Sequence, residues 1–181
     1  EKHNTDITVE VAEPKAGNST INVTVTDETG NPIPGGFVNI TDENGKVIGN
    51  GTIDENGNLV TNITLEPGKH NITVTYNGTD DNEPANKTIR IEIPPYETNI
   101  TVSAKNTEVR NTTEIRGVLE SEGKKIADAD IVIYVGTDKF TTQTNSEGEY
   151  SIDYDAKTAG QKQVTVEYVD QTGKYARAEN A

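Results

Sequence analysis

Apolar residues alternate with polar ones along most of this chain, and this period of two constrains its fold more than any other feature. In residues 7–11 and 21–25 every second residue is Ile or Val. The same phase continues through later segments, at Val38 and Ile40; Leu59, Ile63 and Leu65; Ile72, Val74 and Tyr76; Ile89, Ile91 and Ile93; Ile100 and Val102; Val118; Ile131, Ile133 and Val135; Tyr150, Ile152 and Tyr154; and Val164, Val166 and Tyr168. This alternation predicts strands with one buried and one wet face. No segment keeps the longer period of a helix.

The first half of the sequence is repeated in the second half. Residues 5–9 (TDITV) recur as residues 98–102 (TNITV), a shift of 93, and residues 72–76 (ITVTY) recur as residues 164–168 (VTVEY), a shift of 92. A nearly constant shift indicates two copies of one domain with small loop changes. Pro94 and Pro95 stand at the border, where they favour a stiff, extended linker. We therefore predict two domains, residues 1–93 and 94–181.

Five polar quartets that begin with Asp or Asn and end with Gly separate the predicted strands. They are residues 27–30, 42–45, 54–57, 145–148 and 170–173. An Asp or Asn side chain opens a type I turn, and Gly takes the left-handed position that closes it. About seven short strands per copy, with turns at this spacing, predict an all-β chain of two tandem immunoglobulin-like β-sandwich domains.

Residues 65–78 (LEPGKHNITVTYNG) carry a family pattern. Together with residues 38–45, 48–49 and 57–59, they resemble the group 3 bacterial Ig-like repeat, whose signature is a strand pair, an "lG" turn and then L-x-x-G-x-H-x-I-x-x-x-Y-x-G. The wealth of Asn and Thr is similar to that of adhesin-like surface proteins of methanogenic archaea. The resemblance implies rigid spacers or binding modules in long surface proteins, with motif residues in structural roles and no active site.

The resemblance covers nearly all of the first copy and is looser in the second. There, Gln161 and Lys162 stand where Lys69 and His70 stand in the first copy.

The charge and composition exclude several classes of function. The net charge is −14, from 30 acidic and 16 basic residues, whereas binding to nucleic acid requires clustered Lys and Arg. The chain has no Cys, so no disulfide, zinc–thiolate site or thiol nucleophile is expected, and no cofactor motif is present. No apolar run reaches eighteen residues, so we expect no membrane insertion in this segment. The missing initiator Met and signal peptide suggest a fragment of a longer secreted protein, located extracellularly at the cell surface.

The acidic loops raise the question of calcium binding. Ca²⁺ takes six to eight oxygen ligands, which an EF-hand supplies from an alternating D-x-D-x-D-G pattern, and no turn here has that pattern. The denser group Asp80, Asp81 and Glu83 is a weak calcium candidate, and a solvated loop is the interpretation that we favour. Of the two histidines, His70 precedes a strand, which predicts a packing or hydrogen-bonding role. We predict no catalytic residue.

Sequons for N-linked glycosylation are the strongest chemical signal. The pattern N-x-S/T occurs at Asn18, Asn22, Asn39, Asn50, Asn62, Asn71, Asn77, Asn86, Asn99 and Asn111, whereas chance predicts about three such sites. Several lie in the outward phase of a predicted strand, where a glycan would meet water. Two interpretations stay open: glycosylation, or an outer face built from Asn and Thr that produces the pattern as a by-product.

These observations favour non-catalytic stalk or spacer repeats of a cell-surface adhesin-like protein, acting as a monomeric rod that supports adhesion. One alternative is a binding module, whose partner would be a host or cell-wall glycan or a surface protein. Another is an accessory domain of a surface hydrolase.

Overall fold

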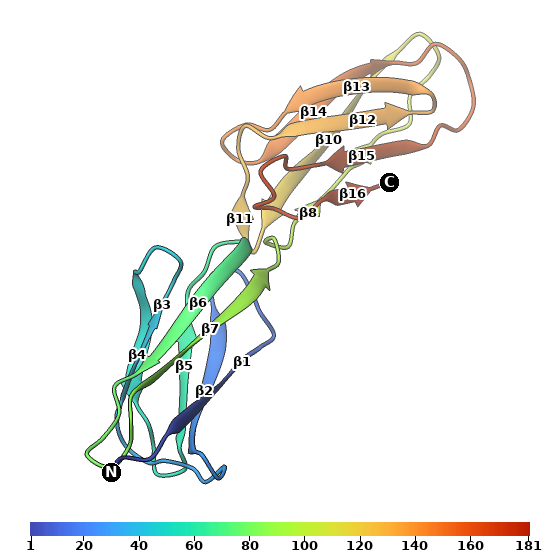
Figure 1. The fold of residues 1–181 in the computed structure, drawn as a ribbon. Helices are drawn as coiled ribbons and strands as arrows, with labels where there is room; N and C mark the ends of the chain where they lie inside the picture. Colours follow the sequence, from blue (N-terminus) through green and yellow to red (C-terminus); the bar gives the residue numbers. More distant parts are fainter. The chain divides into compact units, whose positions relative to one another are not determined.

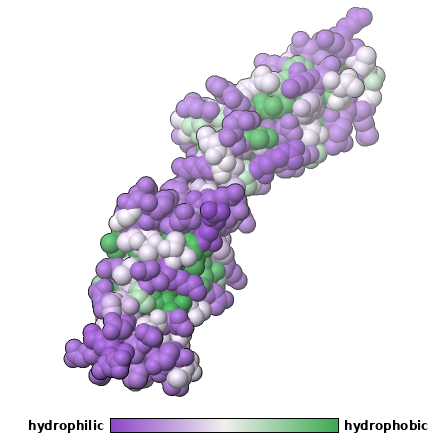
Figure 2. All heavy atoms as spheres, viewed as in Figure 1, coloured by the Kyte–Doolittle hydropathy of each residue, from purple (hydrophilic) through white to green (hydrophobic).

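The computed structural model describes residues 1–181 and contains strands, turns and loops but no helix. The predicted all-β fold is therefore confirmed. The chain divides into two compact units, Glu1–Pro94 and Pro95–Ala181, which are called here the first and second domains (Figure 1). Most of the surface in view is hydrophilic, with small apolar areas (Figure 2). No helix is present that could span a membrane.

The first domain is a sandwich of two antiparallel sheets (Figure 1). One sheet has the order β1 (Thr5–Ala12), β2 (Ser19–Asp27) and β5 (Asn58–Ile63). The other has the order β4 (Val47–Thr52), β3 (Phe37–Thr41), β6 (Gly68–Tyr76) and β7 (Ala85–Ile93).

The alternation in the sequence sets the register of these sheets. On β3 and β6, Val38 pairs with Tyr76 and Ile40 with Val74, and all four side chains are buried. A slip of one residue would turn each of them to water, so the buried face fixes the pairing. The inward residues of both sheets form a single core, and their neighbours in sequence form the outer faces.

The second domain repeats this architecture with interruptions. One sheet has the order β11 (Lys124–Lys125), β10 (Thr112–Ser121) and β14 (Glu149–Asp155), and the short strands β8 (Asn99–Ile100) and β9 (Ser103–Ala104) also pair with β10. The other has the order β13 (Asp138–Gln143), β12 (Asp130–Val135), β15 (Val164–Tyr168) and β16 (Ala178–Asn180).

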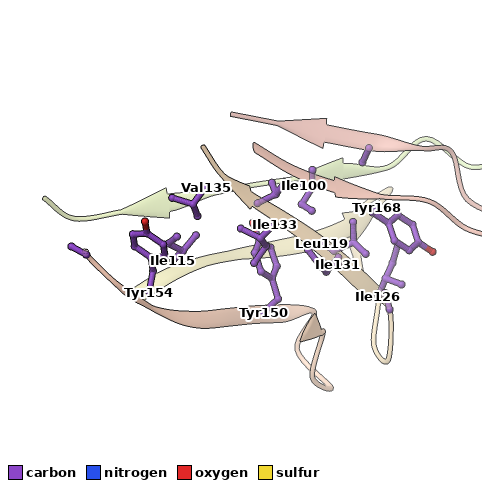
Figure 3. Packing of buried hydrophobic residues seen from close by; sticks show 14 residues of the cluster. Ile100, Ile115, Leu119, Ile126, Ile131, Ile133, Val135, Tyr150, Tyr154 and Tyr168 are labelled. Atoms are coloured by element: carbon purple, nitrogen blue, oxygen red, sulfur yellow. The ribbon is translucent and has the colours of Figure 1, made fainter. Parts of the chain in front are cut away.

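The core of the second domain runs the length of the sandwich. Ile115, Val135 and Tyr154 gather at one end of it, and Ile126 and Tyr168 lie at the other (Figure 3).

One expectation for this core was wrong. Alternation placed Val118 inside, but Ile115 and Leu119 are buried on β10 while Val118 is half-buried. β10 alternates without a break, because Ile115, Leu119 and Ser121 share the inward face with Gly117 between them, and Val118 lies on the other face. Thr101, between β8 and β9, crosses so close to Gly117 that a Cβ there would overlap its carbonyl oxygen. Thr101 also holds β10 through its hydroxyl, which accepts a hydrogen bond from the Val118 amide at 2.9 Å.

In each domain the segment before the first strand pairs with the loop before the last strand. His3 forms a parallel bridge with Asn82 in the first domain, and Tyr96 forms one with Tyr175 in the second. The His3 amide donates to the Asp81 carbonyl, and the Glu83 amide donates to the His3 carbonyl, both at 2.9 Å. The two copies therefore share this parallel bridge as well as the order of their strands.

Candidate functional site

The five acidic or amide turns form as predicted, and their opening side chains bond to their own backbone. In residues 145–148, the Asn145 Oδ1 accepts from the Glu147 amide at 2.9 Å and the Gly148 amide donates to the Asn145 carbonyl at 3.0 Å. The other four turns make the same two bonds from Asp27, Asp42, Asp54 and Asp170. Each of these side chains thus has a structural role.

The hydrogen bonds at Asp27 are the most extensive of the five turns. Its carboxylate accepts from the Thr29 hydroxyl at 2.7 Å and from the Asn31 amide at 3.0 Å. The Thr29 hydroxyl first, and then the Asn31 amide, stabilise the charged form and lower the pKa of Asp27 to about 2.

The weak calcium candidates lie in the loop between β6 and β7. Asp80, Asp81 and Glu83 are exposed, and the hydrogen bonds of this loop run through its backbone and through Thr79, whose hydroxyl accepts from the Asn82 side chain at 2.9 Å. No group of three acidic or His side chains lies together in a way that could hold a metal ion. Calcium binding here stays a prediction without geometric support.

Nine of the ten sequon asparagines are exposed, and Asn39 is half-buried. Three of them lie in one row across the outer face of a sheet, because Asn39 pairs with Asn50 on β4 and with Thr75 on β6, and Thr75 pairs with Asn86 on β7. Residues directly opposite each other on antiparallel strands have Cβ atoms about 5 Å apart. Neighbouring sequons in this row therefore compete for the same space.

Hydroxyl and amide groups also pair across strands on the outer faces. Thr73 and Thr88 approach to 2.9 Å between their hydroxyls, and the Thr20 hydroxyl donates to the Asn62 side chain at 3.2 Å. These contacts account for the Asn and Thr content without any modification. Both interpretations of the sequons therefore stay open.

His70 makes two hydrogen bonds, which agrees with the predicted role, although it lies within β6 rather than before a strand. Its Nε2 donates to the Glu66 carbonyl at 2.7 Å, and its Nδ1 lies 3.0 Å from the Glu43 carboxylate. The side chain is 14% exposed. It ties the β5–β6 loop to the β3–β4 turn, which is a structural role.

A hollow of about 1000 Å³ lies at one end of the second domain. It opens between residues 105–111, which connect β9 to β10, and residues 156–163, which connect β14 to β15; both loops lie at the same end of the ribbon (Figure 1). Its floor includes Ile115, Val135 and Tyr154, the end of the core seen in Figure 3. Two backbone bonds hold the loops together, from the Arg110 amide to the Ala156 carbonyl and from the Ala156 amide to the Asn111 carbonyl.

The family model for the bacterial Ig-like domain (group 3) matches residues 7–93. The first domain belongs to this family. The resemblance carried by residues 65–78 is thereby confirmed. In this Ig-like domain the signature residues have structural roles: Ile72 and Tyr76 are buried, and the Tyr76 hydroxyl donates to the Gly35 carbonyl at 3.1 Å.

Two solved structures, of tenascin and of invasin, support an Ig-like fold for the whole chain. A two-domain fibronectin type III segment of chicken tenascin matches 96% of this chain and 95% of its own, with a TM-score of 0.52 and 12% identity. Invasin, a bacterial integrin-binding protein, matches 90% of this chain with a TM-score of 0.52 and 22% identity. The adhesin InvE of Yersinia pseudotuberculosis matches 96% of this chain with a TM-score of 0.44 and 15% identity.

This chain spans 36% of the invasin structure and 57% of the InvE structure. No curated protein sequence matches it. The likeness to solved structures confirms two tandem Ig-like domains, and the family model places the first domain among bacterial Ig-like domains of group 3.

The hollow was missed by the sequence interpretation, although a signal for it exists. The segment from Ala156 to Val164 is only one residue longer than its counterpart from Leu65 to Ile72, but β15 begins at Val164 whereas β6 already begins at Gly68. Aligning the two Ig-like copies position by position would have shown the exchange of Leu65 for Ala156.

Proposed function

We propose that the two domains are non-catalytic spacer repeats of a cell-surface adhesin-like protein, located outside the cell. The observation that carries this proposal is the repetition itself. Each domain closes its own apolar core and repeats the same bridge before its last strand. A spacer requires no more than stable, soluble, repeated units, and an Ig-like repeat supplies them.

Stability without cross-links supports the same proposal. The chain has no Cys, and no buried side-chain nitrogen or oxygen lacks a hydrogen-bond partner. Because unsatisfied polar groups are costly in a small core, this complete pairing lets each domain persist outside the cell without a disulfide.

Small-angle X-ray scattering of the 181-residue chain tests the spacer role. A nine-residue strand such as β6 spans about 30 Å, and the loops at both ends lengthen each domain to about 40 Å, so two domains in line should reach a maximum dimension of about 80 Å. Replacing Pro94 and Pro95 with Gly should broaden the distance distribution, because glycine removes the stiffness of the linker. A compact particle in which the two domains fold back on each other would contradict the spacer role.

The sequons extend this proposal to N-linked glycans on the outer faces. Asn50 and Asn86 are exposed and have room for a sugar, whereas Asn39 is half-buried directly opposite Asn50. We expect glycans at Asn50 or Asn86 rather than at Asn39. Mass spectrometry of the protein from its native source measures each occupancy, and a glycan on Asn39 together with one on Asn50 would contradict this order.

A further inference from the structure

The two domains differ most in how their loops close the end of the core. In the first domain the Gly17 amide donates to the Leu65 carbonyl, and the side chains of Leu65 and Ala16 are buried over the core. In the second domain the Arg110 amide makes the same bond to the Ala156 carbonyl. Gly17 and Arg110 both have a positive φ, 83° and 73°. Leu65 therefore corresponds to Ala156.

The smaller side chain covers less of the end of the second core. Ala156 lacks the methyl groups with which Leu65 fills this space, while Ile115, Val135 and Tyr154 beneath it remain buried. Val109, which corresponds to the buried Ala16, is 42% exposed at the rim. The volume of the hollow, about 1000 Å³, lies at the upper end of the range for ligand clefts.

The loops around the hollow are basic in an otherwise acidic chain. Residues 105–111 and 156–163 contain four cations, Lys105, Arg110, Lys157 and Lys162, and one acid, Glu108. None of these four cations takes part in an ion pair. Lys105 and Lys162 line the hollow itself. Elsewhere the chain has 29 acids and 12 cations, so these two loops are positive in an acidic chain, while Lys157 lies beside Asp138, Asp153 and Asp155.

Uncharged hydrogen-bonding groups line the rest of the hollow. Asn106, Gln161 and Gln163 line it, and their side chains make no hydrogen bond within the protein. Amides both donate and accept, as sugar hydroxyls do. Val109 offers an apolar contact for the C–H face of a sugar ring.

We propose that this hollow binds an anionic saccharide, one that carries carboxylate or sulfate groups. The ammonium groups of Lys105 and Lys162 pair with the anion, the amides bond to hydroxyls, and Val109 packs against the ring. This function goes beyond a spacer, which needs no ligand.

The test follows the ¹H–¹⁵N spectrum of the full chain as ligands are added. The probes are oligomers of galacturonic acid and of sulfated galactose, with a neutral galactose oligomer of the same length and an oligo-glutamate peptide as comparisons. We expect both anionic sugars to shift resonances of residues 105–111 and 156–163, and the neutral sugar to bind at least about tenfold more weakly.

Variants make the test specific. The pair Lys105→Gln and Lys162→Gln should weaken binding about tenfold or more, and the control pair Lys87→Gln and Lys124→Gln changes the net charge equally but should have no effect. Ala156→Leu should weaken binding, because a larger side chain at the floor makes the hollow shallower, as Leu65 does in the first domain. Circular dichroism confirms that each variant is folded.

Three results would overturn the proposal. One is the absence of shifts in these loops with every anionic sugar. Another is equal loss of binding in the control pair. The third is oligo-glutamate binding as tightly as the sugars, since the site would then recognise charge on a peptide rather than a saccharide.

Discussion

Replacing Gly148 with Ala should destabilise the second domain far more than the same change at Gly173. Both glycines close a turn of the same kind, with φ of 72° and 76°. At Gly173 an added Cβ meets nothing within 4 Å, so only the backbone conformation is strained. At Gly148 it would lie 2.6 Å from the Leu119 carbonyl oxygen and 3.1 Å from the Lys125 Cβ.

The contact at Gly148 is with the central strand of a sheet. The Leu119 carbonyl accepts from the Ile126 amide at 3.1 Å, and the Leu119 amide donates to the Gly148 carbonyl at 2.9 Å. Moving Leu119 away from a new methyl group therefore strains both bonds. A left-handed backbone costs Ala about 1 kcal/mol, and the overlap adds about 2–3 kcal/mol.

We therefore expect a loss in the free energy of unfolding of about 1 kcal/mol for Gly173→Ala and about 3–4 kcal/mol for Gly148→Ala. In a domain of this size each kcal/mol lowers Tm by roughly 4–8 °C. Six of the seven tyrosines lie in the second domain and the chain has no Trp, so tyrosine fluorescence during thermal unfolding reports mainly on that domain. Equal losses for the two variants would refute the reasoning, because the overlap would then carry no cost.

Three further predictions follow from contacts in the cores and turns. Tyr76→Phe should lower the free energy of unfolding of the first domain by about 1 kcal/mol, because it removes the bond to the Gly35 carbonyl; urea titration followed by circular dichroism measures this. Ile133→Ala should cost about 2–5 kcal/mol, because Ile133 is fully buried, and limited proteolysis should then cleave the second domain while the first stays intact. The pKa of Asp27 is lowered to about 2, so the charged carboxylate stabilises the first domain above pH 4, and this effect is lost as the pH falls toward 2. The difference in Tm between the wild type and Asp27→Asn, measured by calorimetry, should therefore shrink over that range. A constant difference would count against the role of its charge.

Much of the fold could be predicted because its determinants are local. Alternation identified the buried faces of β3 and β6, since each residue's environment there follows from its own position. The five turns were predictable for the same reason, because each is closed by residues within one quartet.

The two parts that were missed have different causes. Leu119 rather than Val118 lies in the core because it shares a face with Ile115, four residues earlier on β10, so alternation within the strand itself carried the signal. The hollow lies where Ala156 stands in place of Leu65 of the first copy. Only comparison of the two copies, position by position, makes this visible.

The bridge between His3 and the loop before the last strand has a mechanical consequence. The two segments run parallel, and one leads in from the start of the domain while the other leads out through β7 to its end. Tension applied along the chain therefore pulls the two segments past each other, so that the hydrogen bonds of His3 to Asp81 and Glu83 bear the load at the same time instead of opening one by one. The second domain has the same arrangement between Tyr96 and Tyr175. Each repeat therefore has its own pair of parallel segments that resists unfolding under tension.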